Sequence, residues 1–119
     1  MPGLITQKFH AYIDYPVAAG LIVMPFLLGF SGIAAGLSIA TGIAALLLTL
    51  LTDHETGLFK VLPYKFHLAV DGLVGVAFLI APFVLGFAGL AMAYYLVIGA
   101  TVIAVVGLHS PKTEAVAAS

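Results

Sequence analysis

The chain of 119 residues contains no cysteine and no arginine, and only 8% of its residues are charged. Without cysteine, disulfide bonds, thiolate metal sites and cysteine nucleophiles are excluded. The formal net charge is −1 and no run of basic residues occurs, so nucleic acid is not an expected partner. Apolar residues take the place of the missing charges: they make up 63% of the chain and give a mean hydropathy of +1.23.

A soluble domain of this length cannot cover that much apolar surface. Soluble domains carry about 25% charged residues, and small ones bury only about 60–70% of the surface that their unfolded chains expose. Lipid must therefore cover the remainder. The composition predicts an integral membrane protein.

Two long stretches, residues 15–52 and 72–108, contain no charged residue. As a single helix each would be roughly 57 Å long, whereas the hydrocarbon core of a bilayer is about 30 Å thick. Each stretch must therefore fold back as a helical hairpin, and paired glycines mark the two reversals. The predicted spans are 8–29, 33–52, 64–86 and 90–109.

The two hairpins repeat each other. Residues 8–32 align without a gap with residues 65–89, at a constant offset of 57. We therefore expect an all-α fold with one membrane domain over residues 1–119. Two parallel repeats of two helices each, 8–52 and 65–109, form its four-helix bundle, and a connector at 53–64 joins them. The matched pairs include His10/His67, Asp14/Asp71, Pro25/Pro82, Phe26/Phe83, Gly29/Gly86 and Phe30/Phe87.

The distribution of lysine predicts the orientation of the chain. The first apolar run carries Asp14 and is too long for a signal peptide, so we expect it to be retained as a span. Four spans place both termini and the connector on one side. All the lysines lie on that side, which the positive-inside rule assigns to the cytoplasm. They are Lys8, Lys60, Lys65 and Lys112.

Each repeat carries one acid–imidazole pair near its start. His10 and Asp14 are four residues apart, as are His67 and Asp71, so each pair shares one face of its helix. Ionisable groups within spans normally face the interior of the bundle and find a partner there. If the repeats face each other, both pairs converge near the cytoplasmic edge of the bilayer.

Three interpretations of this cluster remain open. In the favoured one, the four side chains hydrogen-bond to one another as a structural clasp. In the second, His10, Asp14, His67 and Asp71 bind a divalent metal ion, zinc or iron, whose charge the two carboxylates balance. In the third, His10 and His67 are the axial ligands of a haem, and the aspartates orient their rings. Asp53, in the connector, is expected to be solvated, as is Glu55.

Pro25 and Pro82 lie inside their spans. Each removes one backbone hydrogen bond, and we expect a neighbouring helix to satisfy the freed carbonyl group. Tyr94 and Tyr95 begin the fourth span, where we expect them at the outer membrane interface.

The repeated strings around these prolines resemble the signature of the SPW-repeat family of bacterial integral membrane proteins. Met24 and Ala81 stand at the signature's serine, and Phe26 and Phe83 at its tryptophan. The resemblance covers residues 8 to about 109 and implies a bacterial inner membrane, but no settled activity. The strings are Met24-Pro25-Phe26-Leu27-Leu28-Gly29-Phe30 and Ala81-Pro82-Phe83-Val84-Leu85-Gly86-Phe87. Companion motifs are His10-x-x-x-Asp14-Tyr15, Thr52-Asp53-x-Glu55-x-Gly57, Pro63 and His67-x-x-x-Asp71.

The expected function is that of a non-enzymatic membrane component: a scaffold, an assembly factor or an accessory subunit. The alternative is a metal- or haem-binding membrane protein, and the third hypothesis is a small ion or proton transporter. The chain has no phosphate-binding glycine loop and no serine beside a base, so an enzyme is not favoured. A stripe of small residues, Gly36, Ala40 and Ala44, packs either on the first span or on another protomer of a homo-oligomer or larger membrane complex.

Overall fold

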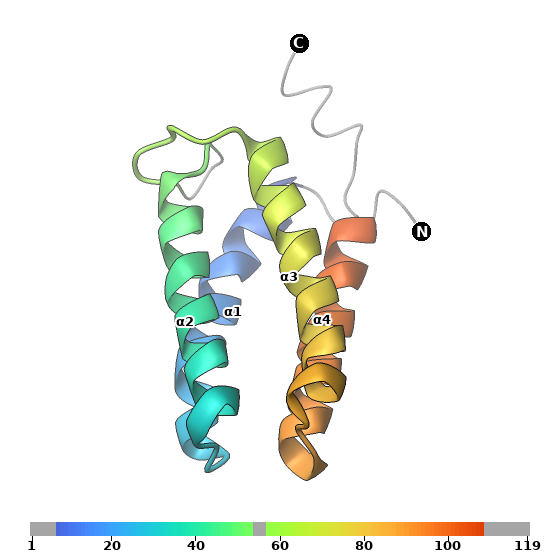
Figure 1. Cartoon of the computed structure of the whole chain (residues 1–119). Helices are drawn as coiled ribbons and strands as arrows, with labels where there is room; N and C mark the ends of the chain where they lie inside the picture. Colours follow the sequence, from blue (N-terminus) through green and yellow to red (C-terminus); the bar gives the residue numbers. More distant parts are fainter. Residues whose placement is uncertain (1–6, 54–56, 109–119) are drawn as a thin grey trace.

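The fold is built from four α-helices, seen in a computed structural model that describes residues 7–53 and 57–108 (Figure 1). They are α1 (Gln7–Leu27), α2 (Gly32–Leu51), α3 (Tyr64–Leu85) and α4 (Gly89–Gly107). Each boundary lies within two residues of the predicted one. The described residues contain no β-strand, only an isolated bridge between Thr52 and Leu62. The prediction of an all-α fold with four helices is confirmed.

All four helices are long and apolar enough to cross a membrane. Each has 19 to 22 residues, close to the roughly 20 that a bilayer requires. Large apolar side chains lie on the outer surface, among them Phe26, Leu73 and Val84, each about 70% exposed. A soluble protein of this size rarely presents so much apolar surface to water.

The two hairpin turns have the same backbone conformation. Gly29 and Gly86 have φ angles of 73° and 76°, which explains why glycine stands there. The amide of Phe30 donates to the carbonyl of Pro25 at 2.8 Å, and the amide of Phe87 donates to that of Pro82 at 2.9 Å. This bond, from a residue to the fifth one before it, closes a helix end.

Glycines bring the helices of each hairpin into backbone contact. A Cβ atom at Gly42 of α2 would lie 2.9 Å from the carbonyl oxygen of Ala18 in α1. A Cβ atom at Gly99 of α4 would lie 2.8 Å from the carbonyl oxygen of Gly75 in α3. The predicted small-residue stripe, Gly36, Ala40 and Ala44, is exposed instead. Its packing on α1 is therefore ruled out.

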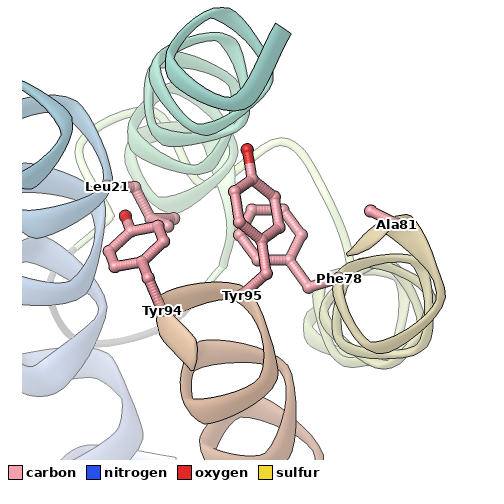
Figure 2. Packing of buried hydrophobic residues seen from close by; sticks show 5 residues of the cluster. All are labelled: Leu21, Phe78, Ala81, Tyr94 and Tyr95. Atoms are coloured by element: carbon pink, nitrogen blue, oxygen red, sulfur yellow. The ribbon is translucent and has the colours of Figure 1, made fainter. Parts of the chain in front are cut away.

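The core residues lie in the halves of the helices that flank the turns. Figure 2 shows how five of them pack together. Tyr94 and Tyr95 of α4 are the centre of this core, with 8% and 0% of their surface exposed, and the ring of Tyr95 lies against Phe78 of α3. The hydroxyl of Tyr95 donates to the carbonyl of Ala34 in α2 at 2.6 Å. Both tyrosines are thus buried with their hydroxyls bonded inside the bundle, while their depth in the membrane stays a prediction.

The proline prediction is confirmed for the first hairpin. Pro25 has no amide hydrogen to donate to the carbonyl of Leu21, four residues earlier. The hydroxyl of Ser38 in α2 donates to that carbonyl at 2.8 Å. Ser38 has only one proton, so the hydroxyl of Tyr94, 2.7 Å away, must donate to Ser38. A chain of hydrogen bonds thus links α1, α2 and α4.

Candidate metal centre

The two predicted acid–imidazole pairs meet between α1 and α3, at the end of the bundle away from the turns. The Nε2 atom of His10 lies 3.1 Å from Asp14 Oδ1 and 3.1 Å from Asp71 Oδ2. The Nε2 atom of His67 lies 3.3 Å from Asp14 Oδ2 and 3.2 Å from Asp71 Oδ2. Each imidazole therefore faces one carboxylate of its own helix and one of the other helix.

The helix period explains half of these contacts and helix packing the other half. Residues four apart share one face, so His10 reaches Asp14 and His67 reaches Asp71. The crossed contacts require α1 and α3 to turn these faces toward each other. Both imidazoles are then 2% exposed, while the Asp14 and Asp71 side chains are 11% and 19% exposed.

A hydroxyl at the end of α2 fixes the protonation of His67. The Oγ1 atom of Thr52 is 2.5 Å from the carbonyl of Leu48, to which it donates, and 2.8 Å from His67 Nδ1. The one proton of Thr52 is used by Leu48, so Nδ1 of His67 must carry the hydrogen of the second bond. In a neutral imidazole this leaves a lone pair on Nε2, directed at the two carboxylates.

His10 has a comparable outer partner. The hydroxyl of Tyr64, at the start of α3, lies 3.0 Å from His10 Nδ1, and the two rings meet edge to face. Sequence reasoning did not assign Thr52 or Tyr64 to the cluster. Their positions were the only indication in the sequence. Thr52 follows the end of one helix and Tyr64 begins another, at the end of the bundle where the histidines lie, and the second nitrogen of each buried histidine needs a partner.

The donor set is compact enough for its four residues to share one metal ion. One ligand atom from each of the four residues can be chosen so that all lie within 4.8 Å of one another. Zinc bonds of about 2.0–2.1 Å imply ligand-to-ligand distances of roughly 3.3–3.4 Å. The four imidazole–carboxylate contacts of 3.1 to 3.3 Å are close to that range, and they involve both oxygens of Asp14 and one oxygen, Oδ2, of Asp71. Two carboxylates and two neutral imidazoles balance the charge of a divalent ion.

Asp53 is exposed, as predicted, while Glu55 lies outside the described residues. The lysine pattern is described only in part, because Lys112 also lies outside them.

A cavity of about 450 Å³ extends from the cluster between the two hairpins. Its walls come from all four helices and are almost entirely apolar. Positions 57 residues apart line it together: Ile13 with Val70, Val17 with Val74, Ala45 with Val102, and Leu48 with Val105.

No protein family, curated protein or solved structure is significantly similar to the chain.

Proposed function

We propose that this chain is a non-enzymatic membrane protein whose two hairpins are held together by a divalent transition-metal ion bound to His10, Asp14, His67 and Asp71. The observation that carries the proposal is the bond between Thr52 and His67, which directs the Nε2 lone pair of His67 at two carboxylates 3.2 and 3.3 Å away. A lone pair facing two anionic oxygens is repulsive unless a cation lies between them.

Two cations satisfy this requirement. A metal ion leaves His67 neutral, and its Nδ1–H donates to an outer partner, as metal-binding histidines normally do. Alternatively, a proton on Nε2 makes His67 an imidazolium, and the cluster is then a purely protonic clasp. We favour the metal because one divalent ion neutralises both carboxylates and makes use of all four contacts.

A haem receives less support. Bis-histidine ligation requires the porphyrin plane to pass between the two Nε2 atoms. Both carboxylates lie within 3.3 Å of those atoms, in the space that the macrocycle would need.

We further propose the membrane in which the site lies, the orientation of the chain and the relation between its two hairpins. We take the four helices to be spans of a bacterial inner membrane, with both termini in the cytoplasm. We take the hairpins to be a duplicated unit of the SPW-repeat type, related by a pseudo-twofold axis. The matching turn angles and the matching glycine contacts at Gly42 and Gly99 support the duplication. The site then lies near the cytoplasmic edge of the bilayer.

Elemental analysis of protein purified without chelators tests the proposal. We expect about one zinc or iron per chain and a loss of the metal in Asp14→Asn. Asp53→Asn removes an exposed carboxylate of the same charge and serves as the control. A protein without stoichiometric metal, colourless and unable to bind added zinc, would contradict the metal and leave the protonic clasp.

Thr52→Val examines the outer partner without touching a ligand. Loss of such a partner typically lowers metal affinity by about 10–100-fold, and we expect the same loss here in a chelator competition titration. Thr49→Val is the matched control: Thr49 is equally buried on α2, and its hydroxyl bonds to the carbonyl of Ala45, not to the cluster. Equal affinity in Thr52→Val and the native protein would show that Thr52 does not set the tautomer.

A further inference from the structure

The cavity beside the cluster has the size and lining of a ligand site. Its volume of about 450 Å³ falls within the roughly 300–1,000 Å³ typical of small-molecule pockets. The walls are mostly aliphatic, with residues such as Val17, Val74 and Val102, and Thr41, Thr49, Phe66 and Thr101 also line them. Water gains few hydrogen bonds in such a space, and an empty cavity forfeits the dispersion contacts of its walls. An apolar occupant restores the dispersion contacts with the walls and needs no hydrogen bonds.

The length of the cavity matches one lipid chain. Along α1 the lining extends from His10 to Leu21, a rise of roughly 16 Å at about 1.5 Å per residue. The hydrocarbon core of a bilayer is about 30 Å thick, so each leaflet, one acyl chain deep, accounts for about 15 Å. The cavity is thus as long as a single chain that enters from one leaflet.

The cluster determines the chemistry of the head group. The carboxylates are its exposed part, at 11% and 19%, whereas the imidazoles are 2% exposed. A head group at this end of the cavity therefore meets oxygens that accept hydrogen bonds. A hydroxyl can donate to them whether or not a metal ion is bound, whereas a carboxylate head has no hydrogen to donate.

We propose that the cavity binds one single-chain lipid with a hydroxyl head group, its apolar chain between the hairpins and its hydroxyl at the carboxylates of Asp14 and Asp71. A monoacylglycerol and a prenyl alcohol share this chemistry. The binding does not depend on the metal.

Native mass spectrometry of the whole chain in detergent tests the inference, with 1-oleoylglycerol and geranylgeraniol as separate probes. At least one of them is expected to bind with a stoichiometry of one, and the stronger of the two identifies the source. Oleate has the same chain as the first probe but an anionic head. Its affinity for the protein is expected to be at least about tenfold lower than that of 1-oleoylglycerol.

Two valines on α3 provide a matched pair of variants. Val74→Phe fills the cavity, whereas Val76→Phe places the same side chain on the outer surface, where Val76 is 48% exposed. We expect roughly tenfold weaker lipid binding in the first and native binding in the second. Should Val74→Phe fail to fold, Ala45→Leu in the cavity wall, where Ala45 is half-buried, and exposed Ala40→Leu repeat the comparison.

Metal content measured on the same samples separates the two proposals. Native metal content with no lipid bound to the native protein would overturn the lipid site alone. Lipid binding that is equal in Val74→Phe and Val76→Phe, or equal for oleate and 1-oleoylglycerol, would also overturn it. A native protein that binds the lipid but contains no metal would count against the proposed function and not against this inference.

Discussion

The bond from Ser38 to the carbonyl of Leu21 makes a sharp prediction about the coupling of two substitutions. Pro25 leaves that carbonyl without its helical donor, and Ser38 supplies the missing hydrogen at 2.8 Å. Ser38→Ala therefore leaves a buried carbonyl without this donor and removes the acceptor of Tyr94. Such losses cost about 1–3 kcal/mol each. In Pro25→Ala the new amide of residue 25 can bond to Leu21, so Ser38→Ala should cost less in that background.

The magnitude follows from a double-mutant cycle. The carbonyl of Leu21 is satisfied in the Pro25→Ala background, and only the Tyr94 bond is then lost. The coupling free energy should therefore be about 1 kcal/mol or more, within the range found for residues that share a partner. Unfolding in mixed micelles with increasing sodium dodecyl sulfate measures all four free energies.

The second proline provides the control. Pro82 is the counterpart of Pro25 in the other hairpin, and it frees the carbonyl of Phe78, four residues earlier, and not that of Leu21. Pro82→Ala and Ser38→Ala share no partner, so their effects should add within about 0.3–0.5 kcal/mol. If Ser38→Ala costs the same in the Pro25→Ala and Pro82→Ala backgrounds, the reasoning about the freed carbonyl is refuted.

Three further predictions concern packing, topology and metal. Gly42→Ala should cost about 1–3 kcal/mol of unfolding free energy because its Cβ meets α1, whereas Gly36→Ala, with open space around it, should gain up to about 1 kcal/mol; equal effects in the same unfolding titration would contradict the packing. The chain has no cysteine, so a membrane-impermeant maleimide applied to intact cells should label Ala88→Cys in a turn but not Leu58→Cys in the connector, and the reverse pattern would invert the proposed orientation. A chelator should lower the melting temperature of the native protein, since an ion at a hundred times its Kd adds about 2.7 kcal/mol, and should leave that of Asp14→Asn unchanged; a native protein indifferent to the chelator would speak against a bound metal.

The hairpins and the cluster could be predicted because both follow from simple lengths. A charge-free stretch twice as long as the bilayer is thick must reverse, and glycines able to adopt positive φ mark the place. Spacing of four places each histidine and aspartate on one helical face, and the constant offset brings two such faces to the same depth. These steps do not require knowing how the helices rotate about their own axes, but the convergence of the two faces does, and the sequence left that as a condition.

The outer partners of the histidines and the burial of the tyrosines depend on that rotation, so the sequence did not predict them. A tyrosine near a helix end has two good environments: the membrane interface, or an interior with a partner for its hydroxyl. Tyr94 and Tyr95 take the interior because Ser38 and the carbonyl of Ala34 lie within reach. Likewise, the small residue that governs contact with α1 is Gly42, which lies outside the exposed stripe.

The two proposed repeats have identical residues at one end of the bundle and different residues at the other, and the cavity lies between these ends. At the cluster the copies are identical, since His10 and His67, like Asp14 and Asp71, must contribute equally to one shared point. Toward the turns they differ: Tyr95 of the second copy stands where the first has Ser38. Two identical hairpins would place either two small or two large residues there, leaving a void or a clash. Divergence at this position lets the tyrosines of one copy fill the space beside the serine of the other. It fills the bundle toward the turns with apolar and hydroxyl contacts, while the opposite end keeps its paired carboxylates. A fused pair can separate these roles, whereas a symmetric homodimer of one hairpin cannot.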